Sequence, residues 1–285
     1  MAPRNQPTAR QVRLGVELRK LRDLAGMSAR EAAGLLTSTS AQMSQIEAGL
    51  SGVSEERVRR LGALYACADE ELIDALVAMA TDRTRGWWEE YRGVLPPGFL
   101  DLSELEHHAR YLRVVSTAHV PGLLQTEEYA RALLGAGNPH APTEATERRV
   151  ALRMRRQELL TREAPPRVWV VMDETVLRWP VGGAAVMRAQ IDHLIEVNRL
   201  PHVTLQIMPF ANGPHPAMRA GAFHLFRFRA PELPDVVYLN GLVGAVYLDK
   251  SDDVVVYREA LDRLGAQAAP ARKTEALLGA IRKEL

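Results

Sequence analysis

The stretch from Met27 to Gly49, MSAREAAGLLTSTSAQMSQIEAG, decides how the N-terminal part of the chain folds. It predicts two short helices joined by a tight polar turn. Ser28 can cap the first helix, with Glu31 at the third helical position to bond back to the cap amide. Thr39 and Gln42 repeat this arrangement at the start of the second helix. The two capped helices indicate a helix-turn-helix.

The second helix of this stretch has an outward face suited to the edges of bases. Met43 and Ile46 are three residues apart and point inward, whereas Ala32, Ala33, Leu35 and Leu36 supply the packing face of the first helix. Glutamine can bond adenine in two places, and serine can meet bases or phosphates. We therefore expect contacts with double-stranded DNA from eight residues: Ser28, Arg30, Thr39, Ser40, Ala41, Gln42, Ser44 and Gln45.

The segments MSAREAAGLL and SAQMSQIEAG together resemble the Xre or lambda-repressor type of helix-turn-helix. An ordinary helical hairpin in a core is the alternative interpretation. The resemblance implies a repressor-like head of five helices. One departure concerns the loop after IEAG, where such proteins commonly carry Arg or Lys that grip phosphate. Here the loop at residues 50–53 is the neutral LSGV, which lowers the expected affinity for DNA.

Three further helices complete the predicted head at residues 1–82. The first covers about 9–25 after a Thr8 cap, the fourth begins after Ser54, and the fifth begins after Asp69. The inward residues expected of them are Val12, Val16 or Gly15, Leu18 and Leu21; Leu61, Leu64 and Tyr65; and Leu72, Ile73, Leu76 and Met79.

Positive charge gathers at the start of this head. Residues 1–30 contain seven Arg or Lys and two Asp or Glu, a balance of +5, although the whole chain carries only +1. A basic helix beside a helix-turn-helix is suited to phosphate contact. A solvated helix face is the alternative.

The composition is that of a soluble globular protein of 285 residues, with 47% hydrophobic and 25% charged residues. No apolar run approaches the roughly 20 residues of a membrane span, and the N-terminus lacks the apolar core of a secretory signal. The single cysteine, Cys67, fits a reducing cytosol and is expected to be a buried thiol. We expect a cytoplasmic, nucleoid-associated protein.

Residues 83–165 are predicted to form a helical connector and docking region. Trp87, Trp88 and Tyr91 suit the docking of one domain or subunit on another better than the stacking of bases. A break at 96–98 is expected to precede a helix from Ser103 through Val115. Thr126 caps a later helix, and the arginines of a long helix at 144–162 form either a second basic patch or, as we prefer, a salt-bridged solvated face. These arginines are Arg148, Arg149, Arg153, Arg155 and Arg156.

Residues 166–285 are predicted to form a mixed α/β domain. Strands at 168–172 and 203–208 flank a helix at 184–198, an order that favours parallel neighbours. Shorter strands follow in AFHLFRF, DVVYLN and AVYLD, with turns at Pro231–Pro234 and Asn240–Gly241. Two helices, at about 252–266 and 271–283, close the chain. The fold class is therefore multidomain, with an all-α head and a mixed α/β C-terminal domain.

Several separated segments of the C-terminal two thirds resemble a group of actinomycete regulators. WWEEYRGVLPP, HVPGLLQTEEYARALLGAG, RRVALRMRRQELL, WVVMDETVLRWPVGG, VTLQIMPF and PDVVYLNGLVGAVYLD agree with the group in order and spacing. Its members are WhiJ-like, antitoxin-like regulators that pair an Xre-type head with a long C-terminal domain. The resemblance implies a small partner protein encoded nearby.

Catalytic chemistry is not indicated. Asp173 and Glu174 follow a buried strand, where catalytic carboxylates often lie, but adjacent acids also simply begin a helix or turn, which we prefer. His107 and His108 are adjacent on a helix and point about 100° apart, which makes them a poor pair of zinc ligands. No phosphate loop or nucleophile elbow occurs in the sequence. We expect no enzyme activity, no cofactor and no metal.

The loop after the strand at 203–208 is the second candidate site. His215, Met218 and Arg219 combine polar and apolar groups in a proline-containing segment, which suits a ligand or partner site as well as it suits a surface crossover. The sequence thus predicts a DNA-binding transcriptional regulator, a homodimer whose C-terminal domain receives a ligand or small-protein signal. The alternative is an antitoxin-like interaction module with a weakened DNA anchor.

Overall fold

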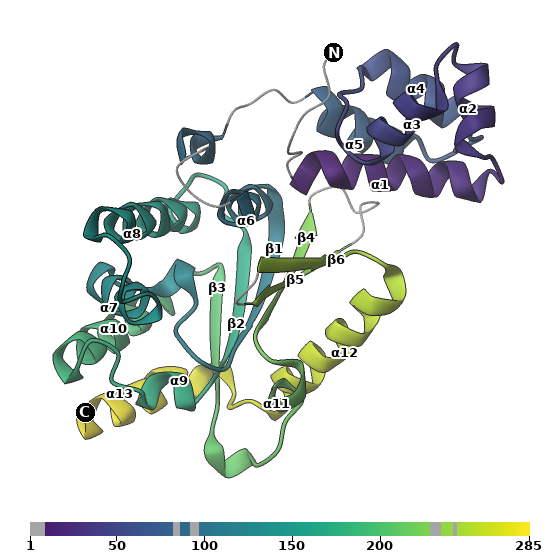
Figure 1. Ribbon diagram of the computed structural model, residues 1–285. Coiled ribbons are helices and arrows are strands. Elements are labelled where there is room, and N and C mark those ends of the chain that lie inside the picture. Colours follow the sequence, from purple (N-terminus) through teal and green to yellow (C-terminus); the bar gives the residue numbers. More distant parts are fainter. Residues whose placement is uncertain (1–8, 82–85, 92–96, 229–234, 242–243) are drawn as a thin grey trace. The chain divides into compact units, whose positions relative to one another are not determined.

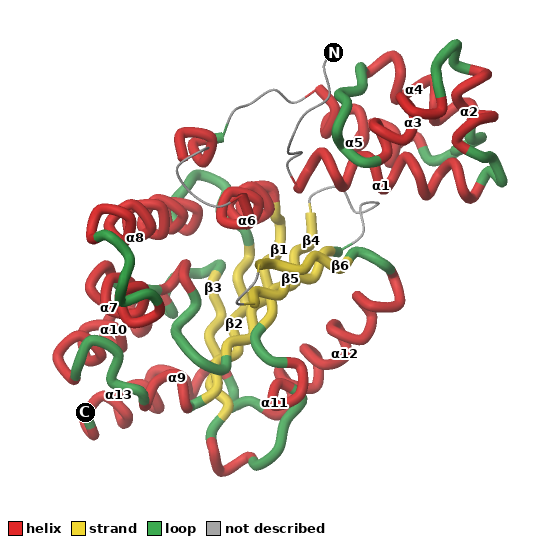
Figure 2. The backbone as a smooth tube through the Cα atoms, viewed as in Figure 1, coloured by secondary structure: helices red, strands yellow, loops and turns green. Residues whose placement is uncertain are grey.

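The structure is a computed structural model that describes residues 9–81, 86–91, 97–228, 235–241 and 244–285. Two compact units divide between Leu105 and Glu106. The structure confirms the predicted fold class, a helical head followed by a mixed α/β region (Figures 1 and 2). Thr8, the predicted cap of the first helix, and the predicted turn at Pro231–Pro234 fall outside the described residues.

The N-terminal unit contains the five predicted helices. They are α1 (Ala9–Leu24), α2 (Ala29–Leu35), α3 (Ser40–Glu47), α4 (Glu55–Leu64) and α5 (Glu70–Thr81). The side chains of Ser28, Thr39 and Ser54 accept hydrogen bonds from the third residue of the helices they cap, as predicted. The apolar faces of the five helices meet in one core, which includes Leu18, Met43, Ile46, Val58, Leu61 and Leu76.

Two glycines allow α1 and the end of α3 to approach closely. A Cβ atom on Gly15 would lie 2.3 Å from the carbonyl oxygen of Glu47. A Cβ atom on Gly49 would lie 2.7 Å from the backbone of Gln11, and Gly49 also has a positive φ of 74°. Glycine suits both demands because it lacks a Cβ atom. The glycine of the IEAG ending therefore shapes the contact with α1 as well as ending α3.

Three predicted packing positions in this unit are wrong. Val12 is 39% exposed, because the inward stripe of α1 runs through Leu14 and Leu18, and Val12 is two residues, or about 200°, away from Leu14. Leu35 is 57% exposed, since Leu36 takes the inward position at the end of α2. Cys67 is half-buried rather than buried, because it follows the end of α4.

Tryptophan and tyrosine side chains cluster in the 3₁₀ helix η1 (Trp87–Tyr91). The ring of Trp87 meets Trp88 and Tyr91 edge to face, at centroid distances of 5.9 and 6.1 Å. Trp88 is only 3% exposed. Its ring is therefore packed inside the protein and is not available to stack on a base.

The helix predicted from Ser103 through Val115 is wrong in both its limits. The helix α6 covers Pro97–His108, so that Pro97 begins it, as proline can at a first helical position. Residues 109–116 then form the strand β1, in the centre of the sheet. Residues 111–115 are rich in types that favour strands, namely Tyr111, Leu112, Val114 and Val115. The pairing of β1 with a strand on each side outweighs the helical spacing of its apolar side chains. The sheet thus begins inside the range that was predicted as a helical connector.

The C-terminal unit is built on a six-stranded sheet in the order β3-β2-β1-β4-β5-β6. The first three strands in this order are parallel, as predicted for the two that flank α10, and the others are antiparallel. The strands are β1 (Ala109–Ser116), β2 (Arg167–Asp173), β3 (Val203–Met208), β4 (Phe223–Phe228), β5 (Val236–Gly241) and β6 (Gly244–Leu248). Asn240 and Gly241, predicted as a turn, are the last residues of β5.

Helices cover both faces of this sheet (Figure 1). On one face α12 (Ser251–Gln267) packs its Leu261 and Leu264 against Val171 and Phe223. Figure 1 shows α7, α8 and α10 on the other side. The helices are α7 (Glu127–Gly137), α8 (Thr143–Gln157), α9 (Thr175–Arg178), α10 (Ala184–Val197), α11 (Ala217–Ala220) and α13 (Thr274–Glu284), with 3₁₀ turns η2 (Gly122–Leu124), η3 (Glu158–Leu160), η4 (Phe210–Asn212) and η5 (Ala271–Lys273).

The arginine-rich side of α8 is not uniformly solvated, contrary to the prediction. Arg156 is 6% exposed and donates two hydrogen bonds to Glu106 of α6, at 2.6 and 2.8 Å. Arg153 donates to Gln125 Oε1 at 2.7 Å, and burial, with the neighbouring Arg156 charge, lowers its pKa to about 10. Arg148 and Arg155 fit the predicted pattern, in exposed ion pairs with Glu144 and Glu158.

Among the described residues, no helix is both long and apolar enough to cross a membrane.

Candidate nucleic-acid interface and sheet-edge site

The outward face of α3 is small, polar and uncharged. Ser40, Ala41, Gln42 and Ser44 are exposed, and Gln45 is half-buried. Met43 and Ile46, on the other side of the helix, are 1% and 2% exposed. The structure therefore presents the side chains that the sequence assigned to base contact on one face of one helix. Whether they touch DNA remains a prediction.

A hydrogen-bond chain holds the side chain of Gln42. Arg57 of α4 donates from Nη2 to Ser38 Oγ at 2.8 Å, and Ser38 Oγ donates to Gln42 Oε1 at 2.9 Å. The sequence predicted that Gln42 would close a capping box with Thr39. Only half of that box forms, because Thr39 accepts from the backbone amide of Gln42 while the side-chain amide turns to Ser38. Within the described residues, Gln42 Nε2 has no hydrogen-bond partner and is available as a donor.

The capping box predicted at Ser28 is complete. Ser28 donates from both its backbone amide and its hydroxyl to Glu31 Oε2, at 2.8 and 2.7 Å. Its hydroxyl in turn accepts from the amide of Glu31 at 3.2 Å. These hydrogen bonds lower the pKa of Glu31. The Ser28 hydroxyl is thus already committed, which leaves it less free for a phosphate than the sequence suggested.

Glu47 of the IEAG ending forms a buried ion pair with Arg22 of α1. Arg22 donates from Nε and Nη2 to the two carboxylate oxygens, at 2.6 and 2.9 Å. Hydrogen bonding to Glu47 raises the pKa of Arg22 against the opposing effect of burial. Arg22 was expected among the basic residues that meet phosphate. It cannot do so, because its guanidinium faces α3 and is 7% exposed.

The predicted basic surface of residues 1–30 is smaller than its charge implies. Arg13, at 6% exposed, is buried like Arg22. Lys20 Nζ lies 3.1 Å from Glu17 Oε1. Arg19 lies 3.7 Å from Asp23. In the described part of this region, Arg30 remains exposed and outside ion-pair distance of any carboxylate. The loop after α3 adds no positive charge, and its Val53 packs into the core.

A second group of predicted residues meets at the carboxyl edge of β2 and β3. Asp173 ends β2, and its Oδ2 lies 2.9 Å from Nε2 of His215, 42 residues further along the chain. Asp173 Oδ1 accepts from the amide of Thr175 at 2.8 Å, and Glu174 Oε2 accepts from the amide of Phe210 at 2.9 Å. Both acids thus fix the loops that leave the sheet. His215 Nδ1 is enclosed and has no hydrogen-bond partner among the described residues.

Met218 and Arg219 lie beyond this pair on the surface. Met218 is 70% exposed, and Arg219 is exposed as well. Two other large apolar side chains, Trp179 and Phe210, are each 56% exposed and lie in segments that follow β2 and β3. Large exposed apolar side chains can mark an interaction site where they form one patch. The loops at this edge therefore offer a surface that sequence reasoning found only in part.

Sequence reasoning missed the partners of several of these residues. The Arg22–Glu47, Arg156–Glu106 and Asp173–His215 pairs join residues 25, 50 and 42 positions apart. No local periodicity links positions at such separations. Gly15 was one available signal for the close approach of α1 and α3, because a glycine disfavours the helix in which it lies and leaves room for a neighbouring backbone.

Comparison with known proteins places both parts of the chain. Residues 13–76 match a helix-turn-helix domain, so the N-terminal unit is of a DNA-binding class. Residues 99–280, well over half of the chain, match a domain of unknown function, DUF5753. The chain therefore belongs to the DUF5753 family. Searches of curated proteins and of solved structures gave no match.

Proposed function

We propose that this protein is a sequence-specific transcriptional regulator that reads DNA with α3 and receives a signal through its C-terminal unit. The observation that carries the proposal is the exposed face of α3, where Gln42 is held in place by Ser38 and Arg57. A side chain fixed before binding loses less conformational freedom when it meets a base. With Oε1 turned toward Ser38, Nε2 is directed to an acceptor such as adenine N7.

Gln45 is the second reader in this proposal. Its side chain is half-buried on the same helix, two turns from the Thr39 cap, and it has no hydrogen-bond partner among the described residues. Arg30 and the exposed Arg60 would meet the phosphates. We infer, from the family resemblance of the sequence, that the protein belongs with the WhiJ-like, antitoxin-like regulators of the Xre type.

The signal would enter at the carboxyl edge of β2 and β3. Exposed Trp179, Phe210 and Met218 supply an apolar contact surface, and the Asp173–His215 pair fixes the loop on which Met218 lies. These features suit a small partner protein, as the resemblance implies. We do not assign catalysis to the pair, because His215 Nδ1 is enclosed and the other nitrogen is occupied by Asp173. A partner shifts the DNA-binding equilibrium only if it prefers one of the two states.

We further propose a cytoplasmic homodimer. One head reads few base pairs and has few exposed cations, so two linked heads would raise the effective concentration of the second contact. Half-sites should then lie about 10 base pairs apart or a multiple of that. A monomer in light scattering, both alone and bound to DNA, would contradict this part of the proposal.

Selection of bound duplexes from a random library tests the DNA-reading function. The full chain should enrich a paired motif, and Gln45→Ala should lose about 1–3 kcal/mol of binding free energy on that motif but little on a scrambled duplex at the same salt. Ala48→Ser, an exposed change at the end of the same helix, serves as the matched control. Equal losses on both duplexes would make Gln45 a non-specific contact.

The neutralised basic residues of α1 favour a second candidate function. With Arg22 buried and the loop at 50–53 uncharged, the head would be a weak DNA anchor for an antitoxin-like interaction module. Failure of the library to enrich any motif, together with capture of one defined partner by the C-terminal unit, would support this alternative.

A further inference from the structure

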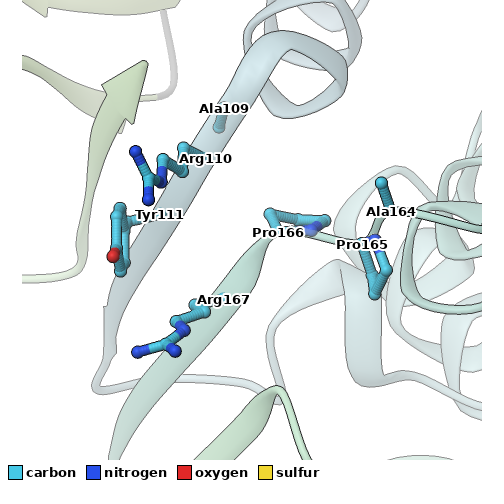
Figure 3. Close-up of a pocket in the computed structure, with 7 residues that line it drawn as sticks. All are labelled: Ala109, Arg110, Tyr111, Ala164, Pro165, Pro166 and Arg167. Atoms are coloured by element: carbon cyan, nitrogen blue, oxygen red, sulfur yellow. The ribbon is translucent and has the colours of Figure 1, made fainter. Parts of the chain in front are cut away.

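A hollow of about 380 Å³ lies where β1 and β2 begin (Figure 3). Two short segments form its wall, residues 109–111 and 164–167. Because β1 and β2 are parallel, their starts share the edge of the sheet opposite to Asp173. The volume falls near the lower end of the roughly 300–1,000 Å³ that is usual for small-molecule sites.

A β-bulge aims Arg110 toward this hollow. Ala109 pairs with Phe228 and Tyr111 pairs with Arg227, so Arg110 is one extra residue in β1. Such a bulge alters the direction of a side chain from the strict alternation of a strand, and bulges often occur beside functional sites. The guanidinium of Arg110 consequently lies over the Tyr111 ring, 5.6 Å from its centroid, instead of on the opposite face.

Arg167 approaches the same ring from β2. It is the direct partner of Tyr111 across the parallel pair, and its guanidinium lies 5.9 Å from the ring centroid. Figure 3 shows the guanidinium groups of Arg110 and Arg167 both directed toward the Tyr111 side chain, with Pro165 and Pro166 on the other side of the hollow. Two cations thus converge on one aromatic ring, and both are exposed.

Other arginines on these strands have carboxylate partners. Arg227 forms two hydrogen bonds with Asp235, each at 3.0 Å, and Arg113, which lies over Trp169, is 3.6 Å from Asp262. Within the residues that the structure describes, neither Arg110 nor Arg167 lies within ion-pair distance of a carboxylate. No carboxylate that the structure describes therefore neutralises the positive charge of this pair.

Hydrogen bonds hold the wall formed by residues 164–167. Arg162 donates from Nε to the carbonyl of Ala164 at 2.9 Å and from Nη1 to the carbonyl of His107 at 2.9 Å. It thereby ties the segment at 164–167 to the end of α6, immediately before Ala109. Pro165 and Pro166 have fixed φ angles, which further limit this segment. A ligand would meet a cavity whose shape exists before it binds.

We propose that this pocket binds a small organic molecule through a phosphate monoester group. Guanidinium groups match phosphate oxygens with paired hydrogen bonds, and a monoester carries about −1.5 to −2 charges at neutral pH, which two arginines would balance. Tyr111 and the two prolines provide an apolar surface for the organic part. This site is separate from the DNA-reading face of α3, so its failure would leave the proposed function standing.

The Nε–Hε signals of arginine in a ¹H–¹⁵N spectrum of the full chain test the proposal, with inorganic phosphate, AMP and adenosine as probes. Phosphate and AMP should shift the signals of Arg110 and Arg167, and adenosine should not. Arg110→Gln and Arg167→Gln should each weaken AMP binding at least ten-fold. Both side chains are exposed, so these variants should keep the circular dichroism spectrum of the parent chain.

Arg113→Gln is the matched control, because Arg113 is also on β1 and lies over an aromatic ring, that of Trp169 on β2, but has a carboxylate partner. It should leave AMP binding unchanged. Three results would overturn the proposal: no shift with phosphate or AMP, equal binding of adenosine and AMP, or an equal loss in Arg113→Gln. A fourth contrary result concerns DNA. If a duplex without terminal phosphates displaced AMP at a concentration below that of AMP, the arginines would be identified as a contact for the DNA backbone.

Discussion

Glu47 and Arg22 form a two-fold hydrogen-bonded ion pair, at 2.6 and 2.9 Å, between the end of α3 and the end of α1. Both side chains are less than one-tenth exposed. The pair also holds the turn that precedes α2, because Arg22 Nη1 donates to the carbonyl of Met27 at 2.7 Å. The position of α3 thus depends on the pairing of a charge on α1 with a charge on α3.

Removal of one partner should destabilise the N-terminal unit strongly. Glu47→Gln removes the buried carboxylate partner of Arg22 and leaves it only the exposed carboxylate of Asp23, 2.6 Å from its Nη1. The loss of one partner from a buried pair costs about 3–5 kcal/mol, which is the upper limit expected here. The double variant Arg22→Met with Glu47→Leu should recover much of this loss, because it leaves no buried charge. Urea denaturation of the three proteins measures both effects. Additive losses in the double variant would show that the two residues do not act as a pair.

Gly15→Ala should destabilise the same unit for a steric reason. The added methyl group would lie 2.3 Å from the Glu47 carbonyl oxygen, so α1 and α3 must separate, at an expected cost of about 1–3 kcal/mol. Gly34→Ala is the matched control. It is also a helical glycine, but its Cβ would meet no atom within 4 Å, and alanine should stabilise the helix by about 0.5–1 kcal/mol. Equal effects of both changes on the urea midpoint would contradict the close contact.

The sequence predicted the elements of the head well, because each helix begins at a local signal. Ser28, Thr39 and Ser54 cap their helices as expected from residues only three positions away. The sequence did not predict which charged residues of α1 are buried. The burial of Arg22 depends on Glu47, which is adjacent only after α1 and α3 have packed.

The C-terminal unit shows the same limit at β1. Its residues have a helical spacing of apolar positions and also a strand-forming composition, and pairing with β2 and β4 decides between them. At the candidate site, Asp173 and His215 were each identified from their places after strands. Their contact could not be predicted, because it depends on the path of the loop between β3 and α11.

Acidification should destabilise the C-terminal unit through His224. Burial, with the charge of Arg156 and the nearby His119, lowers the pKa of His224 from 6.5 to about 3. Above about pH 6.5 the His224 ring is neutral in both the folded and the unfolded protein. As the pH falls below that value, the unfolded chain binds a proton that the folded chain rejects, so stability declines until about pH 3.

His224→Asn should reduce this pH dependence. The slope of unfolding free energy against pH should fall by up to roughly 1.4 kcal/mol per pH unit between about pH 6 and pH 4. The variant will have a lower stability at neutral pH, since a smaller side chain replaces a ring packed against Tyr238. The slope, measured by urea denaturation at several pH values, is therefore the informative quantity. An unchanged slope would mean that His224 is protonated in the folded protein.

The Asp173–His215 contact should govern the order of residues 209–221, the segment between β3 and β4 that includes α11 and Met218. Asp173→Asn weakens a hydrogen bond to a charged group, which contributes about 1.5–3 kcal/mol, and should speed amide hydrogen exchange at residues 209–221. Arg219→Ala, an exposed change in the same segment, should leave exchange unchanged. Equal exchange in Asp173→Asn and the parent chain would show that the loop is held by other contacts.

Ser38 should affect DNA recognition although it lies before α3. Its hydroxyl accepts from Arg57 and donates to Gln42 Oε1, so Ser38→Ala would release the Gln42 side chain while leaving the Thr39 cap and the α3 backbone intact. The loss of one hydrogen bond in such a chain corresponds to about 0.5–1.5 kcal/mol, which is a decrease in affinity of roughly two- to ten-fold. If Gln42 reads a base, this decrease should occur on the selected motif and not on a scrambled duplex. Combination with Gln42→Ala supplies the decisive comparison: Ser38→Ala should have no further effect once Gln42 is gone, whereas a full additional loss would mean that Ser38 contacts DNA itself.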